Sequence, residues 1–376
     1  MTISFSATNP CHIWPLARAV AAEGALRHFY SGYPAWKLGE SGPHIRAHSL
    51  RTNIVYALLK YAPAALRPAP RSLFVWQDRG FDAAVARSLS ECDFIHAMPG
   101  QALATFRAAK KRGIRTVLNH ATGPVRNLVH VMRPEYERAG LRLEDECFYD
   151  ATYFDREDEE YALADYHCAA STVVRDQLVN LGIPRERVWV VPYGADTTAN
   201  VFIRRENDEP PRDFRILFAG QLCLRKGLRT LLDALTLANR ADWRVDFVGS
   251  LSSEVARDFD AYRGATPLHF HGTMPQTQLA ERMRTSSVLV LPSLEEGFGL
   301  VVPQALNCGL PCIVSECTGG KDCVRHRDNG SIFSTGSADA LAAELTWWSE
   351  HPSRTNEHFT WTPGARTLIA ESQAAR

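Results

Sequence analysis

The sequence lacks the features that mark membrane-spanning, secreted or nucleic-acid-binding proteins. No apolar run approaches the ~20 residues that a transmembrane helix needs. Residues 1–20 have neither a basic start nor a continuous apolar core, so we expect no signal peptide. Lysine and arginine together number 42, and aspartate and glutamate also number 42. The chain therefore has no overall basic charge with which to bind nucleic acid.

Metal-binding patterns are also missing. The 9 cysteines are scattered, and no Cys-x-x-Cys pair occurs, so a zinc site is not indicated. Their odd number and irregular spacing favour reduced thiols in a cytosol. Four of them cluster in sequence and are interpreted as small buried apolar residues: Cys308, Cys312, Cys317 and Cys323. There is no convincing Asp-x-Asp segment either, so we expect no metal and no cofactor.

The sequence does have enough length for two domains, because 376 residues exceed what one hydrophobic core usually supports. A polar, proline-containing stretch at 204–212 is the best candidate linker. The pattern divides the chain into an N-terminal domain (1–205), a C-terminal domain (206–357) and a helical tail (358–376).

Short apolar runs alternate with helical patterns on both sides of this linker. Predicted strands lie at 3–7, 94–96, 116–119 and 188–191, and then at 215–219, 243–248, 268–271, 288–291 and 312–314. Predicted helices lie at 16–23, 50–61, 101–111, 133–140, 156–164, 169–181, 228–237 and 358–370. Strand and helix in alternation indicate parallel crossovers, so the fold class is α/β with two doubly wound domains.

The most informative segment is residues 292–306. An apolar run stops at Pro292, and two acidic residues, Glu295 and Glu296, then precede a Gly-Phe-Gly turn. Pro303 suits the first turn of a short helix, and Gly309 suits the position just after its end. A helix that begins at a glycine turn favours phosphate, and a carboxylate before it suits sugar hydroxyls. The segment predicts a site for a nucleotide sugar.

Several motifs together carry a resemblance to a known family. They are Pro292-Ser293, Glu296-Gly-Phe-Gly299, Cys308-Gly-Leu-Pro311, Gly220-Gln-Leu-Cys-Leu-Arg-Lys-Gly227, Val191-Pro-Tyr-Gly-Ala-Asp196, Thr318-Gly-Gly320 and Asn329-Gly330. The chain resembles glycosyltransferase family 4, the retaining, glycogen-synthase-like group 1 enzymes. The likeness covers residues 90–365 well and residues 1–90 weakly. It implies the GT-B architecture: two Rossmann-like domains that face a central cleft, with the C-terminal helix crossing back.

The resemblance also implies an activity. A member of this family would move a sugar from a nucleoside-diphosphate sugar to a hydroxyl of a glycan, glycolipid or small molecule, with retention and without a metal. The setting would be cell-surface polysaccharide or glycoconjugate synthesis, in the cytoplasm and with peripheral contact at the inner face of the membrane. Two alternatives stay open: a catalytically silent nucleotide-sugar-binding protein and a GT-B nucleotide-sugar epimerase. The oligomeric state is not indicated.

Candidate residues follow from the chemistry and from the resemblance. The cations Arg225 and Lys226 would stabilise the leaving diphosphate, although a solvated charge pair is the plain alternative. Glu296 would hold hydroxyls of the donor sugar, and its alternative is a charge at a helix N-terminus. The backbone of Phe298, Gly299 and Leu300 would face the phosphates, near Gly220. Glu295 is interpreted as solvated surface.

Two positions depart from the family pattern. Gln304 stands where the family has a second glutamate, which binds the ribose; ribose contact and an exposed first-turn residue are equally open for it. Gln221 follows Gly220 where the family often has arginine, which leaves the cationic role to Arg225 and Lys226. We expect the affinity for donor to differ from the family norm.

In the N-terminal domain, His120 follows a predicted strand, at the edge where ligands of open α/β sheets bind. It is a candidate catalytic residue near the donor sugar, with a structural polar residue as the alternative. His96 has a similar but weaker placement. His12 lies in the first loop, where the family often has phosphate-contacting glycines. Arg175 is a further candidate for approach to the phosphate.

Overall fold

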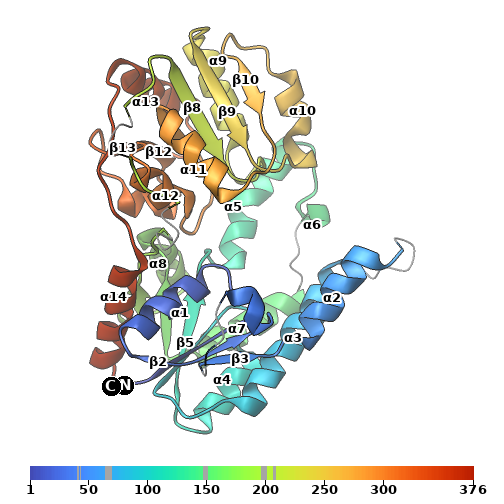
Figure 1. Cartoon of the computed structure of the whole chain (residues 1–376). Coiled ribbons are helices and arrows are strands. Elements are labelled where there is room, and N and C mark those ends of the chain that lie inside the picture. The colour runs from blue at the N-terminus through green and yellow to red at the C-terminus, as the bar shows by residue number, and fades with distance from the viewer. Residues whose placement is uncertain (40–41, 43, 64–69, 147–150, 196–200, 206–208) are drawn as a thin grey trace.

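The computed structural model describes residues 1–39, 42, 44–63, 70–146, 151–195, 201–205 and 209–376. Figure 1 shows two lobes, each built around a twisted sheet with helices on both faces. The predicted boundary at 205/206 adjoins residues 206–208, which lie outside this description, so the division stays a prediction. Asp196, the last residue of the turn motif at 191–196, also lies outside it.

The N-terminal lobe holds a parallel sheet of seven strands in the order β3-β2-β1-β4-β5-β6-β7. These strands are β1 (Ile3–Ala7), β2 (Leu26–Ser31), β3 (Ile45–Ala47), β4 (Phe94–Ala97), β5 (Arg115–His120), β6 (Tyr166–Ala169) and β7 (Val188–Val190). Strand β1 is fully buried and pairs with β4 through Phe5 opposite His96. All carboxyl ends therefore lie at one edge, which faces the other lobe.

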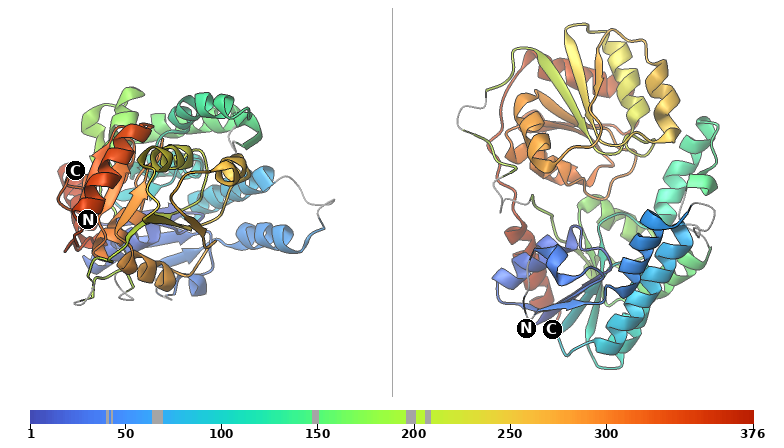
Figure 2. Two further views of the ribbon diagram at one scale, coloured as in Figure 1. Left: turned by 90° about the horizontal axis from the view of Figure 1, so that it is seen from above. Right: turned by 45° about the vertical axis from the view of Figure 1, so that its right-hand side comes forward.

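Helices cover both faces of this sheet. They are α1 (Ile13–Ala22), η1 (Ala35–Leu38), α2 (Leu50–Tyr61), α3 (Pro70–Ser88), α4 (Leu103–Lys110), α5 (Val125–Arg138), α6 (Leu143–Glu146), α7 (Ala151–Leu163), α8 (Thr172–Asn180) and η3 (Arg185–Arg187). The right-hand view of Figure 2 shows α2 and α3 side by side at the outer face of the lobe.

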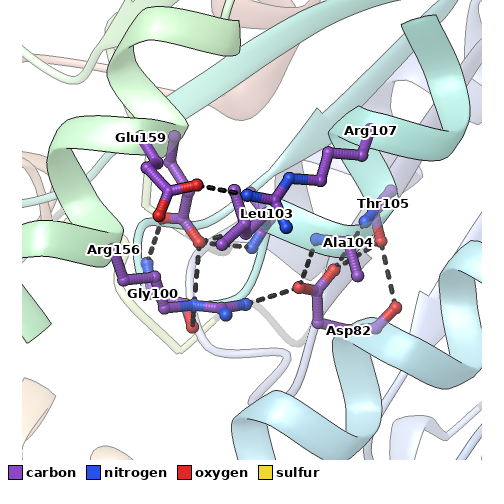
Figure 3. Close-up of polar contacts among 10 residues, drawn as sticks. Asp82, Gly100, Leu103, Ala104, Thr105, Arg107, Arg156 and Glu159 are labelled. Carbon is purple, nitrogen blue, oxygen red and sulfur yellow. Dashed lines mark hydrogen bonds and ion pairs between the residues drawn. The ribbon is translucent and has the colours of Figure 1, made fainter. Parts of the chain in front are cut away.

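Two buried carboxylates hold α3, α4 and α7 together (Figure 3). Glu160 of α7 accepts hydrogen bonds from the amides of Gly100, Ala102 and Leu103 at 2.6–3.0 Å. Asp82 of α3 accepts from the next two amides, those of Ala104 and Thr105, at 2.7 and 2.8 Å. The amides of residues 102–105 lie at the N-cap and in the first turn of α4, where no intrahelical acceptor exists, and that of Gly100 lies in the turn just before it. Arg156 forms ion pairs with both carboxylates.

The C-terminal lobe holds a parallel sheet of six strands in the order β10-β9-β8-β11-β12-β13. These are β8 (Phe214–Ala219), β9 (Trp243–Val248), β10 (Leu268–Phe270), β11 (Val288–Leu291), β12 (Cys312–Ser315) and β13 (Gly330–Phe333). The flanking helices are α9 (Leu228–Ala238), α10 (Ser253–Ala261), α11 (Gln276–Thr285), α12 (Val301–Asn307), η4 (Gly319–Cys323) and α13 (Ala338–Glu350). The prediction of two doubly wound α/β domains is confirmed.

Two helices pass between the lobes. The tail helix α14 (Trp361–Ala374) crosses back onto the N-terminal lobe, where Arg366 bonds Glu23 at 2.9 Å, so both termini lie together (Figure 1). Helix α5 runs the other way: Met132 and Tyr136 join the hydrophobic cluster of the C-terminal sheet. The tail crossing agrees with the expected architecture, whereas the docking of α5 was not foreseen.

Several elements escaped the sequence analysis. Strands β2, β3, β6 and β13 and helices α3, α6, α10, α11 and α13 were not predicted, and α5 begins at Val125 rather than at residue 133. Strand β2 carries Arg27 and His28 among its apolar residues, and α3 follows a proline-rich stretch, so local composition obscured both. Pro134 lies inside α5, where a proline usually signals a boundary.

Candidate functional site

The predicted donor segments meet at the carboxyl edge of the C-terminal sheet. Strands β8 and β11 are neighbours, so the loops that follow them, at 220–227 and 292–299, lie side by side. The amide of Leu294 donates to the carbonyl of Arg225 at 2.8 Å. Gly227 begins α9 with φ +71°, and a Cβ there would lie 1.9 Å from the carbonyl oxygen of Pro292. Only glycine allows this approach.

Four charged side chains gather where these loops meet. Lys226 Nζ pairs with the carboxylate of Glu296. Arg225 Nη1 lies 3.3 Å from Glu296 Oε2 and 3.4 Å from Glu295 Oε2, and it donates to the carbonyl of Glu295 at 2.9 Å. The predicted residues Arg225, Lys226 and Glu296 are thus brought together, and their formal charges balance within the cluster once Glu295 is included.

The pKa values of the two carboxylates are shifted in opposite directions. Burial raises the pKa of Glu296, but the charges of Lys226 and Arg225 outweigh that effect and hold the pKa below its usual range. Burial raises the pKa of Glu295, and the attraction of Arg225 does not fully offset it. Glu296 is therefore ionised at neutral pH.

The interpretation of Glu295 as solvated surface was wrong. Glu295 is only 2% exposed. Arg225 draws its carboxylate inward, and the chain after β5 covers it. A Cβ on Gly123 in that chain would lie 3.3 Å from Glu295 Oε1. The turn is irregular, so adjacent side chains are not forced to opposite faces as they are in a strand. The acidic pair was visible in sequence, but nothing local indicated that both members are buried.

Backbone bonds fix the turn that carries Glu296. Its amide donates to the carbonyl of Cys317 at 3.2 Å, and its carbonyl accepts from the amide of Gly319 at 2.9 Å. From the other lobe, Ser171 Oγ donates to the carbonyl of Gly297 at 2.6 Å. The role of Ser171 was missed by the sequence analysis, since 126 residues separate it from Gly297 and no local pattern connects them.

The two lobes touch at this turn. A Cβ on Gly297 would lie 2.2 Å from the carbonyl oxygen of Ala121. Next to it, Asp322 of η4 accepts from the amide of Thr172 at the start of α8 at 2.7 Å, and also from the Thr172 hydroxyl. The candidate site therefore lies at the junction of the lobes, bounded by residues 121–123 on the N-terminal side.

The remaining predicted donor residues line the same edge. Gly299 has φ +81° and Gly220 has φ +147°, and a Cβ on Gly220 would meet nothing within 4 Å. The ring of Phe298 is buried and packs on Tyr193 with centroids 5.2 Å apart, so only its backbone is available to a ligand. Leu300 and Gln304 are half-buried, the latter in the first turn and a half of α12.

His120 lies behind this junction. It ends β5 as predicted, but its side chain is buried, and its Nε2 lies 3.0 Å from Nδ1 of His167. Burial, together with His167, holds the pKa of His120 well below its usual range. The structure brings the following residues, 121–123, to the candidate site by their backbone, and it keeps the imidazole against His167 and Tyr161.

The other N-terminal candidates have different surroundings. The ring of His12 stacks on Tyr193 at 5.0 Å, and burial lowers its pKa to about 4. His96 is fully buried and bonds the side chain of Asn119 at 3.0 Å. Arg175 bonds Asp176 at 2.8 Å. His12 is linked to the candidate site through Tyr193, whose ring also packs on Phe298.

Among the described residues, no group of three or more histidine, cysteine or carboxylate side chains is placed to hold a metal ion. Within the same residues, no helix has both the length and the apolar character needed to cross a membrane.

Comparison with known proteins places these motifs in a wider context. Residues 200–360 match the family model described as glycosyl transferases group 1. D-inositol 3-phosphate glycosyltransferase 1 of Catenulispora acidiphila is 30% identical in an alignment of 334 positions that covers 78% of this chain and 75% of that protein. Lipopolysaccharide 1,6-galactosyltransferase of Salmonella typhimurium is 26% identical over 191 residues, so the match spans about half of each chain (48% and 52%).

Solved structures share the fold across the whole chain. Anabaena HepE in complex with UDP has a TM-score of 0.62 at 17% identity, covering 100% of this chain and 98% of that one. The catalytic domain of starch synthase IV from Arabidopsis thaliana, bound to ADP and acarbose, has a TM-score of 0.69 at 12% identity, covering 100% and 99%. The expectation of a GT-B architecture is confirmed.

Proposed function

The chain belongs to the glycosyl transferases group 1 family, and on this premise we propose that it transfers a sugar from a nucleoside-diphosphate sugar to a hydroxyl acceptor. The observation that carries the proposal is the cluster of Arg225 and Lys226 with Glu296 at the carboxyl edge of the C-terminal sheet. It joins cations for a diphosphate to an ionised carboxylate for sugar hydroxyls. We further propose family 4 membership and transfer with retention.

The reaction breaks the bond between the anomeric carbon and a phosphate oxygen and forms a bond from the acceptor oxygen to the same carbon. Negative charge grows on the leaving diphosphate, and Lys226, Arg225 and the amides at the start of α9 stabilise it. The acceptor proton passes to the leaving phosphate on the same face of the sugar. No residue of this chain needs to act as a nucleophile in that step.

Glu296 has two partners in turn. Without donor, its carboxylate neutralises Lys226. When the diphosphate arrives, its charges attract Lys226 and Arg225, and Glu296 then accepts hydrogen bonds from the sugar. The backbone of Phe298, Gly299 and Leu300, just before α12, faces the phosphates. Gln304 contacts the ribose without the charge assistance of a carboxylate. His120 was predicted as a catalytic residue; we propose instead that it is a positioning residue that acts through the backbone at 121–123.

The acceptor belongs to the N-terminal lobe. Relatives named as acting on lipopolysaccharide and on D-inositol 3-phosphate support a glycan, glycolipid or small polyol as acceptor. We propose a role in cell-surface polysaccharide or glycoconjugate synthesis, in the cytoplasm and with contact at the inner face of the membrane. Metal independence also stays a prediction.

One alternative is favoured by a specific observation. Gln304 and Gln221 replace charged residues of the family pattern, as expected of a nucleotide-sugar-binding protein that has lost transfer activity. Donor binding without transfer or hydrolysis across many acceptors would favour it. Product analysis distinguishes a GT-B epimerase from a transferase, because epimerisation needs no acceptor.

The donor is identified by thermal unfolding in the presence of UDP, GDP, ADP and their sugars. A ligand at 100 times its Kd adds about 2.7 kcal/mol to the free energy of unfolding, so the correct nucleotide raises Tm by several degrees. The shift should disappear in Lys226→Ala and persist in Lys111→Ala, since Lys111 lies on the exposed end of α4. No shift with any nucleotide would contradict the proposal.

Turnover then tests the chemistry. With the donor found, Lys226→Ala and Glu296→Ala should each lower kcat by about a hundredfold or more, since each removes a charge from the buried site. Full activity in both variants would refute the assignment. The anomeric configuration of the glycosidic bond in the product, observed by NMR and compared with that of the donor, decides between retention and inversion.

A further inference from the structure

Exposed apolar side chains are concentrated in one region of the N-terminal lobe. Of the nine large apolar residues that are exposed among the described residues, six lie on η1, α2 and α3. The most exposed are Trp36 (75%), Leu50 (74%) and Tyr61 (74%). The others are Ile54, Tyr56 and Trp76. Single exposed apolar residues are common, but a group of this kind marks an interaction surface.

Helix α2 shows that this exposure is organised. Leu50, Ile54, Ala57 and Tyr61 have the spacing of one helix face, and all four are exposed. Its buried residues are Thr52 and Val55, on the other side. The helix thus packs on the lobe with one face and presents an apolar stripe outward. Such a stripe is what a surface helix normally directs into a core.

The same region has a one-sided charge. In the sequence from residue 24 to residue 77, one acidic residue, Glu40, stands against seven basic ones, although the whole chain is balanced. The basic residues are Arg27, Lys37, Arg46, Arg51, Lys60, Arg67 and Arg71. Further along α3, Arg79 adds another exposed cation, whereas the acidic residues Asp78 and Asp82 are half-buried and buried.

Contacts make the three elements one continuous surface. Tyr33, just before η1, bonds Tyr56 of α2 through their hydroxyls at 2.8 Å, and Lys37 lies over both rings. Arg51 of α2 lies over the ring of Trp76 of α3 at 4.4 Å. The right-hand view of Figure 2 shows these helices on the outside of the lobe, away from the C-terminal sheet. We call this surface the η1–α2–α3 face.

A groove between α2 and α3 completes it. Its volume is about 410 Å³, and its lining includes Arg51, Arg71, Arg79, Ser72 and Trp76. Three guanidinium groups, a hydroxyl and an indole, without a carboxylate, form a lining suited to a phosphate ester.

We propose that the η1–α2–α3 face binds an anionic phospholipid membrane. The apolar stripe of α2 enters the boundary between headgroups and acyl chains, Trp36, Tyr61 and Trp76 lie at headgroup level, and the arginine groove takes headgroup phosphates. The N-terminal lobe, which we propose as the acceptor side, is thereby held at the lipid surface. The inference concerns surface chemistry and does not depend on the reaction proposed above.

The combination of features distinguishes this occupant from two others. Nucleic acid would use the cations and aromatic rings but would leave the stripe of Leu50 and Ile54 in water. A second copy of the chain would cover the stripe but would bring like charges together, because the face carries its own excess of cations. An anionic bilayer satisfies both the apolar stripe and the charge.

The experiment is sedimentation of the full chain with vesicles, in the absence of any nucleotide sugar. Vesicles of phosphatidylcholine mixed with phosphatidylglycerol should bind the protein, vesicles of phosphatidylcholine alone should bind it far less, and added salt should weaken the binding. Because no donor is present, failure here leaves the proposed reaction untouched, and failure of the donor screen leaves this inference untouched.

Matched variants locate the surface. Lys60→Gln and Arg79→Gln should each lower the partition coefficient about fivefold, given about 1 kcal/mol per cation near the membrane surface. Lys111→Gln and Arg257→Gln, exposed cations elsewhere, should leave it unchanged. Leu50→Ser with Tyr61→Ser should lower it about tenfold or more. Leu237→Ser with Phe270→Ser replaces exposed apolar residues of the C-terminal lobe and should leave the partition coefficient unchanged.

Three outcomes would overturn the inference. One is equal binding to neutral and anionic vesicles, or to neither. Another is a loss of vesicle binding in the control variants as large as that in the variants of the η1–α2–α3 face. The third is a dimeric mass by light scattering that becomes monomeric in Leu50→Ser with Tyr61→Ser, because the face would then be a subunit interface. Unchanged Tm values in the variants confirm that lost binding does not reflect unfolding.

Discussion

At the scale of the residue, neighbouring positions have opposite electrostatic behaviour. Glu295 and Glu296 are adjacent and both buried, yet the pKa of the first is raised and that of the second is lowered. The difference comes from Lys226, whose ammonium pairs with Glu296. Sequence analysis recognised Glu296, Arg225 and Lys226 from motif and spacing. It missed Glu295, because the burial of a charged side chain depends on segments distant in sequence.

His96 provides a test of buried histidines through pH. Burial lowers its pKa to about 3, whereas in the unfolded chain it takes up a proton near its ordinary pKa of 6.5. The unfolded state therefore binds more protons between these values, and stability is lost as pH falls below about 6.5. In His96→Asn this loss is absent, so the destabilisation caused by the substitution should shrink by up to about 1.4 kcal/mol per pH unit.

The measurement is urea unfolding of both proteins between neutral pH and about pH 5. Comparing variant with wild type cancels the other titrating groups, including Glu157 and Glu160, whose pKa values burial raises to about 7. If the free energies of unfolding of the two proteins ran parallel against pH, His96 would take up its proton in the folded state as readily as in the unfolded state.

At the scale of the element, helix ends decide local stability. The start of α4 has no side-chain cap of its own, and its amides are satisfied by Asp82 and Glu160 from two other helices (Figure 3). The sequence predicted α4 from its periodicity. It did not predict the cap, because the capping carboxylates are 22 and 58 residues away from the amides of Ala104 and Ala102.

Asp82→Asn should destabilise the fold by about 3 kcal/mol, because it removes the charge that faces buried Arg156. The matched control is Glu159→Gln, next to Glu160 on α7: its ion pair with Arg107 is half exposed, and its loss should cost less than about 1 kcal/mol. Urea unfolding measures both. Equal losses in the free energy of unfolding would show that the buried carboxylate stabilises the fold no more than the exposed one.

At the scale of the whole molecule, one glycine and a capped helix bring the lobes together. Because Gly297 has no side chain, the carbonyl of Ala121 can lie close to it. Asp322 accepts a hydrogen bond from the amide of Thr172 at the start of α8. These contacts form a wall between the candidate donor site and the sheet that carries His120. Closure of this kind excludes water and limits hydrolysis of a donor.

Gly297→Ala should separate the lobes, because its Cβ would lie 2.2 Å from the carbonyl oxygen of Ala121. The expected result is a larger radius of gyration by small-angle X-ray scattering, with little change in the unfolding of each lobe. Gly42→Ala is the control, since a Cβ there meets nothing within 4 Å. An unchanged scattering curve for Gly297→Ala would mean that the junction relaxes without opening.

The sequence by itself determined the two alternations of strand and helix, the tail helix, and the candidate donor turn with Glu296, Arg225 and Lys226. These depend on local periodicity, on glycine conformation and on short motifs, which neighbouring residues control. Only the tertiary structure decided that Glu295 is buried, that α5 packs on the opposite lobe, that His120 faces His167, and that α2 exposes an apolar stripe. Each of those outcomes depends on which distant segments cover a side chain, and local sequence does not encode that coverage.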